Sequence, residues 1–456
     1  MPAGKREVMW PRLVASKILR KTLGSNNFVA DFPSNDTEII STDSAELPSC
    51  LGQKSLCSKR VILNDYQERH SYKVFVSTWN VGGVAPSENF NIEELLDTSN
   101  TSCDIYVIGF QEIVPLRASN VLGSENSRIT MKWNSLIRET LNKKTCIQET
   151  DNNKNEAGKP KEKETSFPTN DGKSRENGNL TPEFRCIICK QMVGILISVW
   201  VRSDLRPFVR NPSVSCVGCG IMGCLGNKGS VSVRFRLHET SFCFVCSHLA
   251  SGGREGDERY RNANAAEILS RTSFPKGASL DLPRKILDHD RIILLGDLNY
   301  RISLPERETR LLVDGEEWDA LLQNDQLMME LMVGQVLEGW QEGTIKFPPT
   351  YKYHPNSDEY YGHVESKKGE KKRAPAWCDR IIWFGHGLKQ HLYTRGESRL
   401  SDHRPVKAIF TTEVVVSRRL KGLQSFFLSE RFERIKLPST DGHRRSSFKI
   451  KNKYTP

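Results

Sequence analysis

Residues 292–301, with the sequence IILLGDLNYR, join a short apolar run to four polar side chains. The β-branched and aliphatic residues before Gly296 predict a buried strand. The polar residues that follow are Asp297, Asn299, Tyr300 and Arg301. A carboxylate, an amide, a phenol and a guanidinium at one strand end suit phosphate held near a hard metal ion. Gly-Asp after a strand is also an ordinary turn, so this cluster needs partners.

Such partners occur at the ends of other predicted strands. Strands over residues 73–80 and 104–112 are predicted to end in Asn80 and Glu112. The others are His248 in CSHLASGG, Asp379 in APAWCDRI, and Asp402 and His403 in LSDHRP. Because strand ends at one edge of a sheet pair are presented together by a rigid scaffold, we expect a single site.

The side-chain types in this set favour metal-assisted phosphate chemistry. Glu112, Asp297 and Asp402 offer oxygen ligands, which suit Mg²⁺ better than a thiol-seeking metal. The two histidines could stabilise phosphoryl oxygens and manage protons. Each residue alone has an ordinary structural explanation, but six strand-end positions with the same polar character together indicate a site.

The elements that must position these residues are mostly strands. Further strands are predicted over 186–201, 213–217, 230–236, 241–247, 291–295, 380–384 and 405–411, and helices over 258–271 and 316–337. Helical stretches fall between groups of strands. The predicted fold is therefore α/β (α+β), a two-sheet β-sandwich flanked by helices.

The composition limits which partners and which cellular locations are expected. The 456 residues carry 66 Lys and Arg against 55 Asp and Glu, a net charge of +11 that fits an acidic partner. No apolar run approaches the ~20 residues that span a bilayer, and charges interrupt the N-terminus where a signal peptide would be apolar. We expect a cytoplasmic protein, peripheral at anionic membranes, with a monomer as the default state.

The chain is predicted to have three parts. Residues 1–70 form a basic N-terminal extension and linker, residues 71–415 a catalytic domain, and residues 416–456 a basic C-terminal tail. Polar residues with hardly an apolar anchor predict a disordered insertion over 143–182. Near the N-terminus, MWPRLVASKILRK predicts a basic amphipathic helix, either on a membrane or docked on the domain.

A series of motifs resembles the inositol polyphosphate 5-phosphatases of the endonuclease/exonuclease/phosphatase superfamily. They are WNVGG, GFQEIVPL, GNKGSVSVRF, SHLASG, GDLNYRI, PTYKY, PAWCDRI and SDHRPV, and they cover about residues 72–412. The opening MWPRLVASKILRK, the insertion and SHLASGGREGDE look like the plant-type branch of that family. The family fold, a two-sheet sandwich flanked by helices, agrees with the elements predicted above.

The resemblance implies how the metal is held. Glu112, helped by Asn80, would bind Mg²⁺, and Asp402 would sit beside it. The metal would neutralise phosphate charge and polarise the leaving oxygen. Water would attack the phosphate directly, with no covalent enzyme intermediate.

The resemblance also implies the catalytic roles. Asp297 would orient or deprotonate the attacking water, with Asn299 fixing its geometry. His403, held by Asp379, would hydrogen-bond the scissile phosphate, and His248 would donate to the same phosphate.

Substrate contacts follow from matched positions. The family pattern implies Tyr300 and Arg301 at the 5-phosphate, Tyr351, Lys352, Lys371 and Arg373 at the 4-phosphate, and Lys228 near the 1-phosphate or lipid linkage. Charge-assisted hydrogen bonds to a dianion contribute about 1.5–3 kcal/mol each. Substrates that lack one of these phosphates should therefore bind and react much less well. One departure is Asn264, where the family usually has Asp; loss of a supporting carboxylate there could reduce activity.

The leading hypothesis is Mg²⁺-dependent removal of the 5-phosphate from PtdIns(4,5)P2 and PtdIns(3,4,5)P3. Basic extensions and the apolar Val121 and Leu122 in a loop favour lipid. The main alternative is preference for soluble Ins(1,4,5)P3 and Ins(1,3,4,5)P4. A nuclease of the superfamily and an inactive phosphoinositide-binding scaffold are the remote alternatives, although no nucleic-acid partner is expected.

Overall fold

The computed structural model describes residues 27–31, 67–98, 101–115, 127–143, 183–220, 227–276, 282–362 and 373–417. Residues 27–31 and 69–416 among these belong to one compact unit, which contains the candidate site; the few others fall in a second unit. The predicted N-terminal helix, most of the predicted insertion, the Val121–Leu122 loop, Lys371 and the tail beyond residue 417 lie outside the described residues.

Two six-stranded mixed sheets make the centre of this unit. The first has the order β11 (Leu388–Arg395), β12 (Val406–Ser417), β1 (Gln67–Asn80), β2 (Ile105–Gln111), β4 (Ile195–Arg202), β3 (Phe184–Met192). The second has the order β5 (Val209–Gly218), β6 (Gly229–Leu237), β7 (Thr240–His248), β8 (Arg291–Asp297), β10 (Asp379–Phe384), β9 (Gln341–Glu342). The predicted two-sheet sandwich is confirmed.

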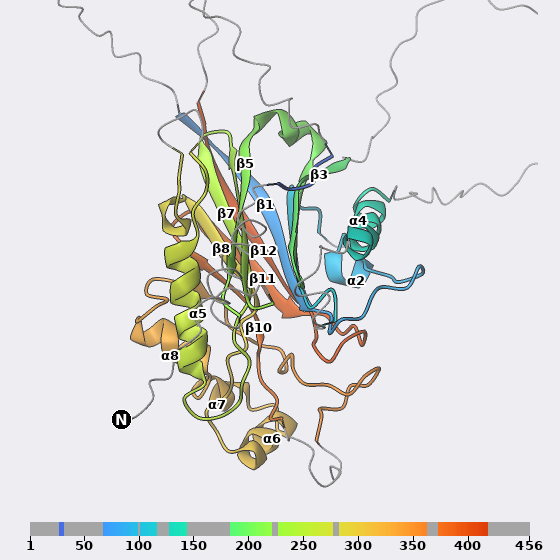
Figure 1. Cartoon of the computed structure of the whole chain (residues 1–456), viewed down its shortest axis with the longest axis vertical. Coiled ribbons are helices and arrows are strands. Elements are labelled where there is room, and N and C mark those ends of the chain that lie inside the picture. The colour runs from blue at the N-terminus through green and yellow to red at the C-terminus, as the bar shows by residue number, and fades with distance from the viewer. Residues whose placement is uncertain are drawn as a thin grey trace, which may run out of the picture. The chain divides into compact units, whose positions relative to one another are not determined.

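Helices cover the outer faces of both sheets (Figure 1). The first sheet is flanked by α2 (Glu93–Leu96) and α4 (Ser127–Leu141), and the second by α5 (Glu258–Arg271) and α8 (Gln326–Val333). Helices α6 (Glu306–Asp314) and α7 (Trp318–Leu322) lie beyond the end of the strands. The described part of the chain also contains two 3₁₀ helices, Ser203–Phe208 and Ile286–Asp288. Within the described part of the chain, none of the helices has the length and apolarity needed to cross a membrane.

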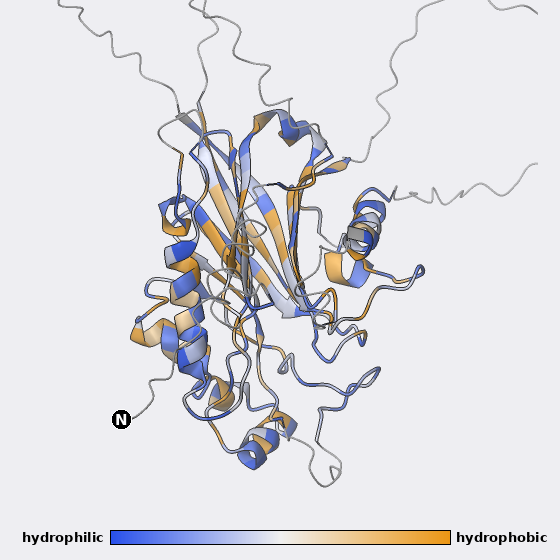
Figure 2. Ribbon diagram, in the orientation of Figure 1, coloured by the Kyte–Doolittle hydropathy of each residue, from blue (hydrophilic) through white to orange (hydrophobic). Residues whose placement is uncertain are grey.

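Strand alternation explains the three apolar layers. In β1, Val74 and Val76 point into the cluster between the sheets, whereas Phe75 joins the cluster under α2 and α4. A third cluster, which includes Ile268 and Leu327, lies between the second sheet and helices α5 and α8. Figure 2 shows apolar residues concentrated in the strands, while α5 is largely hydrophilic. Because the strands are buried on both faces, they read as nearly continuous apolar runs.

Two parallel pairs bring the chemistry to one edge of the sandwich. Strand β1 pairs with β2 and β7 with β8, both in parallel, so each pair ends at the same edge. Asn80 ends β1, Glu112 follows β2, and His248 and Asp297 end β7 and β8. The strand-end residues that the sequence predicted to share one site are therefore neighbours in the structure.

Several sequence predictions needed correction. The helix predicted over 316–337 is wrong as one element: α7 ends at Leu322 and α8 begins at Gln326. The strand predicted over 186–201 is a hairpin, β3 and β4, turning at Val193 with positive φ. The helix predicted over 258–271 is confirmed as α5.

Candidate active site

The register of the second sheet aligns the site's main residues. His248 lies opposite Asp297 across β7 and β8, and Asp297 lies opposite Asp379 across β8 and β10. Gly296 has φ +154°, and a Cβ there would lie 1.9 Å from the carbonyl oxygen of Ser247. A side chain at Gly296 would push β7 away from β8, so glycine keeps His248 and Asp297 in register.

Residues from the first sheet meet them across the sandwich. Asn80 Nδ2 donates to Asp297 Oδ2 at 2.9 Å and to Glu112 Oε1 at 3.4 Å. The Asn80 oxygen accepts from the backbone N–H of Gly82 at 3.0 Å, which fixes the amide orientation. The NH₂ of Asn80 thus holds two buried or half-buried carboxylates side by side.

Asp297 is fully buried among positive and polar groups. His248 Nε2 lies 3.1 Å from Asp297 Oδ2 and 3.7 Å from Glu112 Oε1, and Lys228 Nζ contacts the same nitrogen. Burial opposes ionisation of Asp297, but His248, His403 and Lys228 outweigh it and lower its pKa. Asp297 is therefore a carboxylate at neutral pH, able to accept a proton or a hydrogen bond.

The same neighbourhood lowers the affinity of two bases for protons. Burial, followed by the charge of Lys228, lowers the pKa of His248. Burial also lowers the pKa of Lys228, against the pull of Asp297 and Glu112.

His403 and Asp379 form a second buried pair. His403 Nδ1 donates to Asp379 Oδ2 at 2.8 Å, and Thr350 Oγ1 donates to the same oxygen at 2.7 Å. Burial works against a charged imidazole, but Asp379, Asp297 and Asp402 outweigh it and raise the pKa of His403 to about 9. His403 is accordingly an imidazolium at neutral pH, with Nε2 free of Asp379 and able to donate.

Among the described residues, one group of side chains offers atoms at metal-binding spacing. Donor atoms of Asp297, Asp379 and His403 lie within 4.8 Å of one another, and the buried Asp379 Oδ1 has no hydrogen-bond partner. Since the Nδ1 proton of His403 binds Asp379, this nitrogen is no ligand. The carboxylate oxygens of Glu112 and Asp297 are the better donors, and an all-oxygen set fits a hard divalent cation. Asn80, predicted to help hold the metal, presents its NH₂ to these oxygens and its own oxygen to the Gly82 N–H, so in this conformation it positions the carboxylates and is not itself a ligand.

Asp402, from the C-terminal part of the described chain, lies beside the loop that follows Asn80. Its Oδ1 would lie 3.2 Å from a Cβ at Gly82, and its Oδ2 lies 3.0 Å from Lys352 Nζ. Burial raises the pKa of Asp402, but His403 and Lys352 outweigh burial and lower it.

Comparison with known proteins decides the family. The family model described as endonuclease/exonuclease/phosphatase family 2 matches residues 77–409. Type IV inositol polyphosphate 5-phosphatase 9 of Arabidopsis thaliana is 63% identical over 426 residues, 93% of this chain and 96% of the relative. The chain belongs to the inositol polyphosphate 5-phosphatase family. As a member, it is a phosphatase, and thus a hydrolase.

Two further similarities agree with this assignment. Type I inositol polyphosphate 5-phosphatase 8 of Arabidopsis thaliana is 42% identical over 433 residues, 90% of this chain and 87% of the relative. The crystal structure of the inositol polyphosphate 5-phosphatase domain of SPsynaptojanin, with inositol (1,4)-bisphosphate and a calcium ion, is 29% identical. It covers 79% of this chain and 90% of that domain, with a TM-score of 0.62.

Cations and aromatic rings border the candidate catalytic residues of this 5-phosphatase. Arg301 donates to Asn299 Oδ1 at 2.6 Å and lies over the ring of Tyr351, 4.5 Å from its centroid. The Tyr351 ring is also 4.5 Å from that of His403. Arg373 lies beside Gly253, near the loop that follows His248.

Tyr300 is the predicted site residue that the structure does not bring to this cluster. Its side chain is fully buried beneath α5, and its hydroxyl donates to Asn262 Oδ1 at 2.7 Å. Its place in the GDLNYR motif reflects packing behind the site.

One supporting residue of the 5-phosphatase site was missed from the sequence, and a second, Asn264, was noted there only as a departure from the family. Thr350, which binds Asp379, adjoins Tyr351 in the PTYKY motif and could have been noticed there. Asn264 Oδ1 accepts from the backbone N–H of Ala250 at 3.0 Å, two residues after His248. A carboxylate oxygen of Asp would accept the same hydrogen bond from Ala250, so Asn264 retains this supporting contact.

Proposed function

We propose that the chain hydrolyses the 5-phosphate of phosphoinositides, chiefly PtdIns(4,5)P2 and also PtdIns(3,4,5)P3, by Mg²⁺-dependent direct attack of water. The observation that carries this proposal is the buried, ionised Asp297, held by Asn80 and His248 where the two sheets meet. An ionised carboxylate accepts a hydrogen bond from water and so orients it, and the lowered pKa of Asp297 favours this role over full removal of the proton.

Asp297 acts as the group that orients or deprotonates the attacking water. Asn299 fixes its geometry, since the backbone N–H of Asn299 donates to Asp297 Oδ1 at 3.1 Å. The side chain of Asn299 is held in turn by Arg301 and by the carbonyl oxygen of Leu249. Preorganisation of this kind costs no rearrangement during the reaction.

His403 donates from Nε2 to the scissile phosphate, and Asp379 keeps the imidazolium charged and oriented. His248 adds a second polar contact on the same side, next to Lys228. A hydrogen bond from a cation to a phosphoryl oxygen stabilises the negative charge that develops as the bond to the inositol breaks.

Glu112 and Asp297 offer the oxygens that hold the divalent ion, with Asp402 beside them. When bound, Mg²⁺ supplies charge neutralisation at the phosphate and polarises the leaving oxygen. The calcium ion in the SPsynaptojanin domain is likewise a hard, oxygen-seeking cation, which supports a site of this type.

Specificity for a 4-phosphate is assigned to cations beyond the catalytic residues. The inositol (1,4)-bisphosphate bound by the SPsynaptojanin domain is what remains of inositol (1,4,5)-trisphosphate after loss of its 5-phosphate. Lys352, Tyr351 and Arg373 border the site here, and Lys371 completes the set implied by the sequence. Tyr351 additionally stacks with Arg301.

Lipid is favoured over soluble inositol phosphates by the basic extensions at both ends of the chain. Lysines and arginines near an anionic surface each contribute about 1 kcal/mol to membrane attraction. Preference for Ins(1,4,5)P3 is the alternative.

The test is phosphate release from three substrates: PtdIns(4,5)P2 in vesicles, soluble Ins(1,4,5)P3, and PtdIns(5)P, which lacks the 4-phosphate. Each is measured with Mg²⁺ and with EDTA, and Asp297→Ala is the inactive control. We expect rapid, Mg²⁺-dependent release from the first substrate and much slower release from PtdIns(5)P.

Each other outcome removes a defined part of the proposal. Release from Ins(1,4,5)P3 alone would keep the chemistry and remove the lipid assignment. Equal rates on PtdIns(4,5)P2 and PtdIns(5)P would remove the role of the 4-phosphate contacts. Binding without turnover would make the protein a scaffold.

A further inference from the structure

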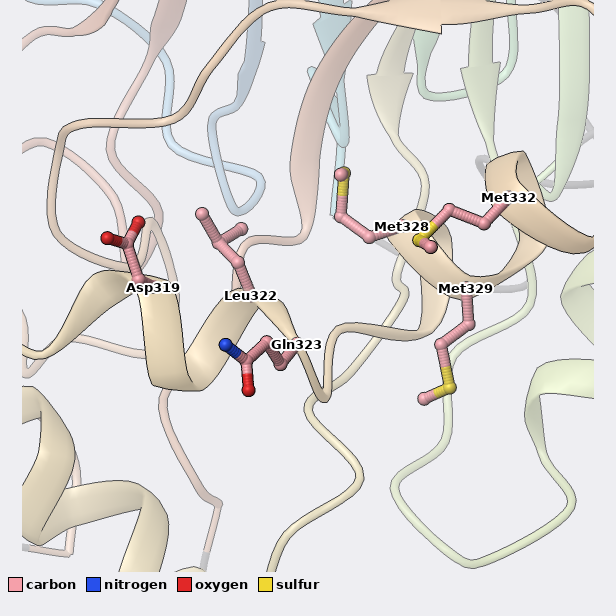
Figure 3. Close-up of a pocket in the computed structure, with 6 residues that line it drawn as sticks. All are labelled: Asp319, Leu322, Gln323, Met328, Met329 and Met332. Carbon is pink, nitrogen blue, oxygen red and sulfur yellow. The ribbon is translucent and has the colours of Figure 1, made fainter.

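A methionine-lined groove lies between α7 and α8, away from the residues that carry the phosphatase chemistry. It has a volume of about 380 Å³ and is lined by Asp319, Leu322, Gln323, Met328, Met329 and Met332. Figure 3 shows Asp319 and Leu322 on α7 and Gln323 directly after it, with the three methionines on α8 at the other side of the gap. The groove plays no part in the function proposed above.

The apolar surface of the groove is unusually open to solvent. Met332 is 82% exposed, Val333 next to it is 67% exposed, and Met329 is 37% exposed. Clustered exposed apolar side chains mark a contact surface more often than isolated ones do. Methionine is flexible and polarisable, so a surface built from it adapts to the shape of an inserted helix.

Buried contacts of Asp325 support the start of α8, which forms one side of the groove. Asp325 caps α8 by accepting from the backbone N–H of Met328 at 2.9 Å, and both its oxygens bind the buried Arg380. Arg380 also pairs with Glu342 through two hydrogen bonds. These buried contacts hold the first turn of α8, which carries Met328 and Met329, in place.

The segment that builds the groove is acidic in a basic protein. Residues 306–342 carry ten carboxylates and two guanidinium groups, whereas the whole chain has a net charge of +11. Asp319 lines the groove, Glu316 and Glu317 are exposed just before α7, and the Glu338 side chain lies beside Gly334 after α8. An anionic membrane would be repelled here, and two such grooves would repel each other.

A basic amphipathic helix is the occupant that fits an acidic, methionine-lined groove. Residues 9–21, MWPRLVASKILRK, carry four basic residues and no acidic residue. Trp10, Leu13, Val14 and Ile18 follow the i, i+3, i+4, i+8 spacing of helix-in-groove anchors. The basic C-terminal tail fits less well, because Glu430 and Glu433 interrupt its apolar stretch.

We propose that residues 9–21 of this chain dock as a helix in the groove between α7 and α8. Apolar anchors enter among the three methionines, and the basic residues face Asp319 and the glutamates around it. Docking would also touch the helix that supports the site, because the Gln326 side chain on α8 accepts from the backbone N–H of Arg301 at 2.9 Å.

The test is amide hydrogen exchange of the full chain, read by mass spectrometry. We expect residues 9–21 to exchange roughly tenfold or more slowly than a synthetic peptide of the same sequence, since a docked helix exchanges only while undocked. Replacing two exposed groove residues, Met329→Glu with Met332→Glu, should restore the rate of the free peptide. Leu311→Glu, an exposed apolar position on α6 that does not line the groove, is the matched control and should change nothing.

Other results would overturn the proposal. Exchange of residues 9–21 at the peptide rate, or slow exchange that survives the groove variant, would show that the segment is not in the groove. Protection that disappears on dilution would point to contacts between copies. Loss of binding to anionic vesicles in the groove variant, with exchange of residues 9–21 unchanged, would make this face a membrane contact instead.

Discussion

At the residue scale, the site works through pairs of groups that set one another's charge. Asp297 is kept ionised by the positive groups around it, and His403 is kept protonated by Asp379. One pair supplies a proton acceptor and the other a cationic donor, both buried, where electrostatic interactions are strong. The sequence supplied the residue types, but which histidine is charged depends on distances that only the fold gives.

Changing Asp379→Asn should show what this pair does. A group with a raised pKa keeps its proton below that pKa, so activity that needs charged His403 should fall as pH rises through about 9. Without the carboxylate, the falling limb should move to lower pH and kcat should drop by roughly 10²-fold or more. The pH profile of kcat on soluble Ins(1,4,5)P3 measures both. A variant with lower kcat and an unmoved limb would show that His403 is not the group observed.

Asn264 gives a second prediction at this scale. Because its oxygen accepts from Ala250 N–H, Asn264→Asp should leave kcat within about twofold, as the acceptor is retained. Asn264→Leu removes the acceptor and leaves that N–H without a partner, at a cost of about 1–3 kcal/mol. The loop after His248 should then be displaced and kcat should fall. If the aspartate variant were much faster than the native chain, the missing charge would matter, and the supporting role assigned to the oxygen would be incomplete.

At the element scale, strands with two buried faces were predicted well and polar or irregular elements were not. Strand β11 was missed because LKQHLYTR mixes charged and apolar residues at a sheet edge. Helix α4 was missed although Trp133, Ile137 and Leu141 repeat every four residues on its buried face. The prediction of one helix over 316–337 failed because Asp325 has an extended backbone and caps the start of α8. Its side chain pairs with Arg380, a residue far away in the sequence that the local pattern could not reveal.

That buried ion pair should dominate the stability of this region. Arg380 is fully buried, so Asp325→Asn leaves its charge short of a partner and should lower the free energy of unfolding by about 3–5 kcal/mol. The exposed pair of Arg69 and Glu413 is the control: Glu413→Gln should cost under about 1 kcal/mol. Urea unfolding measures both. Equal effects of the two variants would contradict the role given to burial.

At the scale of the whole molecule, charge is distributed unevenly along the sequence. The 306–342 segment is acidic, while residues 418–456 carry eleven Lys and Arg against three Asp and Glu. Motifs identified the family, and the structure brings most of the residues that they name into one cluster. Composition alone predicted an acidic partner but left lipid and soluble substrates open, because both are anionic and both would enter the same site.

The tail offers a way to separate these two substrates. Changing Lys449, Lys451 and Lys453 to Gln removes three positive charges that lie outside the proposed site. If the tail meets an anionic membrane, each charge contributes about 1 kcal/mol, so binding to phosphatidylserine vesicles and turnover of PtdIns(4,5)P2 should fall by roughly tenfold or more. Turnover of Ins(1,4,5)P3 should stay unchanged, since that substrate needs no surface.

A control variant with the same net charge makes the argument specific. Lys132, Lys276 and Lys389 are exposed on the folded unit, and changing all three to Gln should leave vesicle turnover within about twofold of the native chain. Raising NaCl from 0.1 M to 1 M shortens the screening length from about 10 Å to about 3 Å, and should abolish the difference between the two variants. Equal losses at low salt would mean that total charge, rather than the tail, brings the enzyme to the membrane.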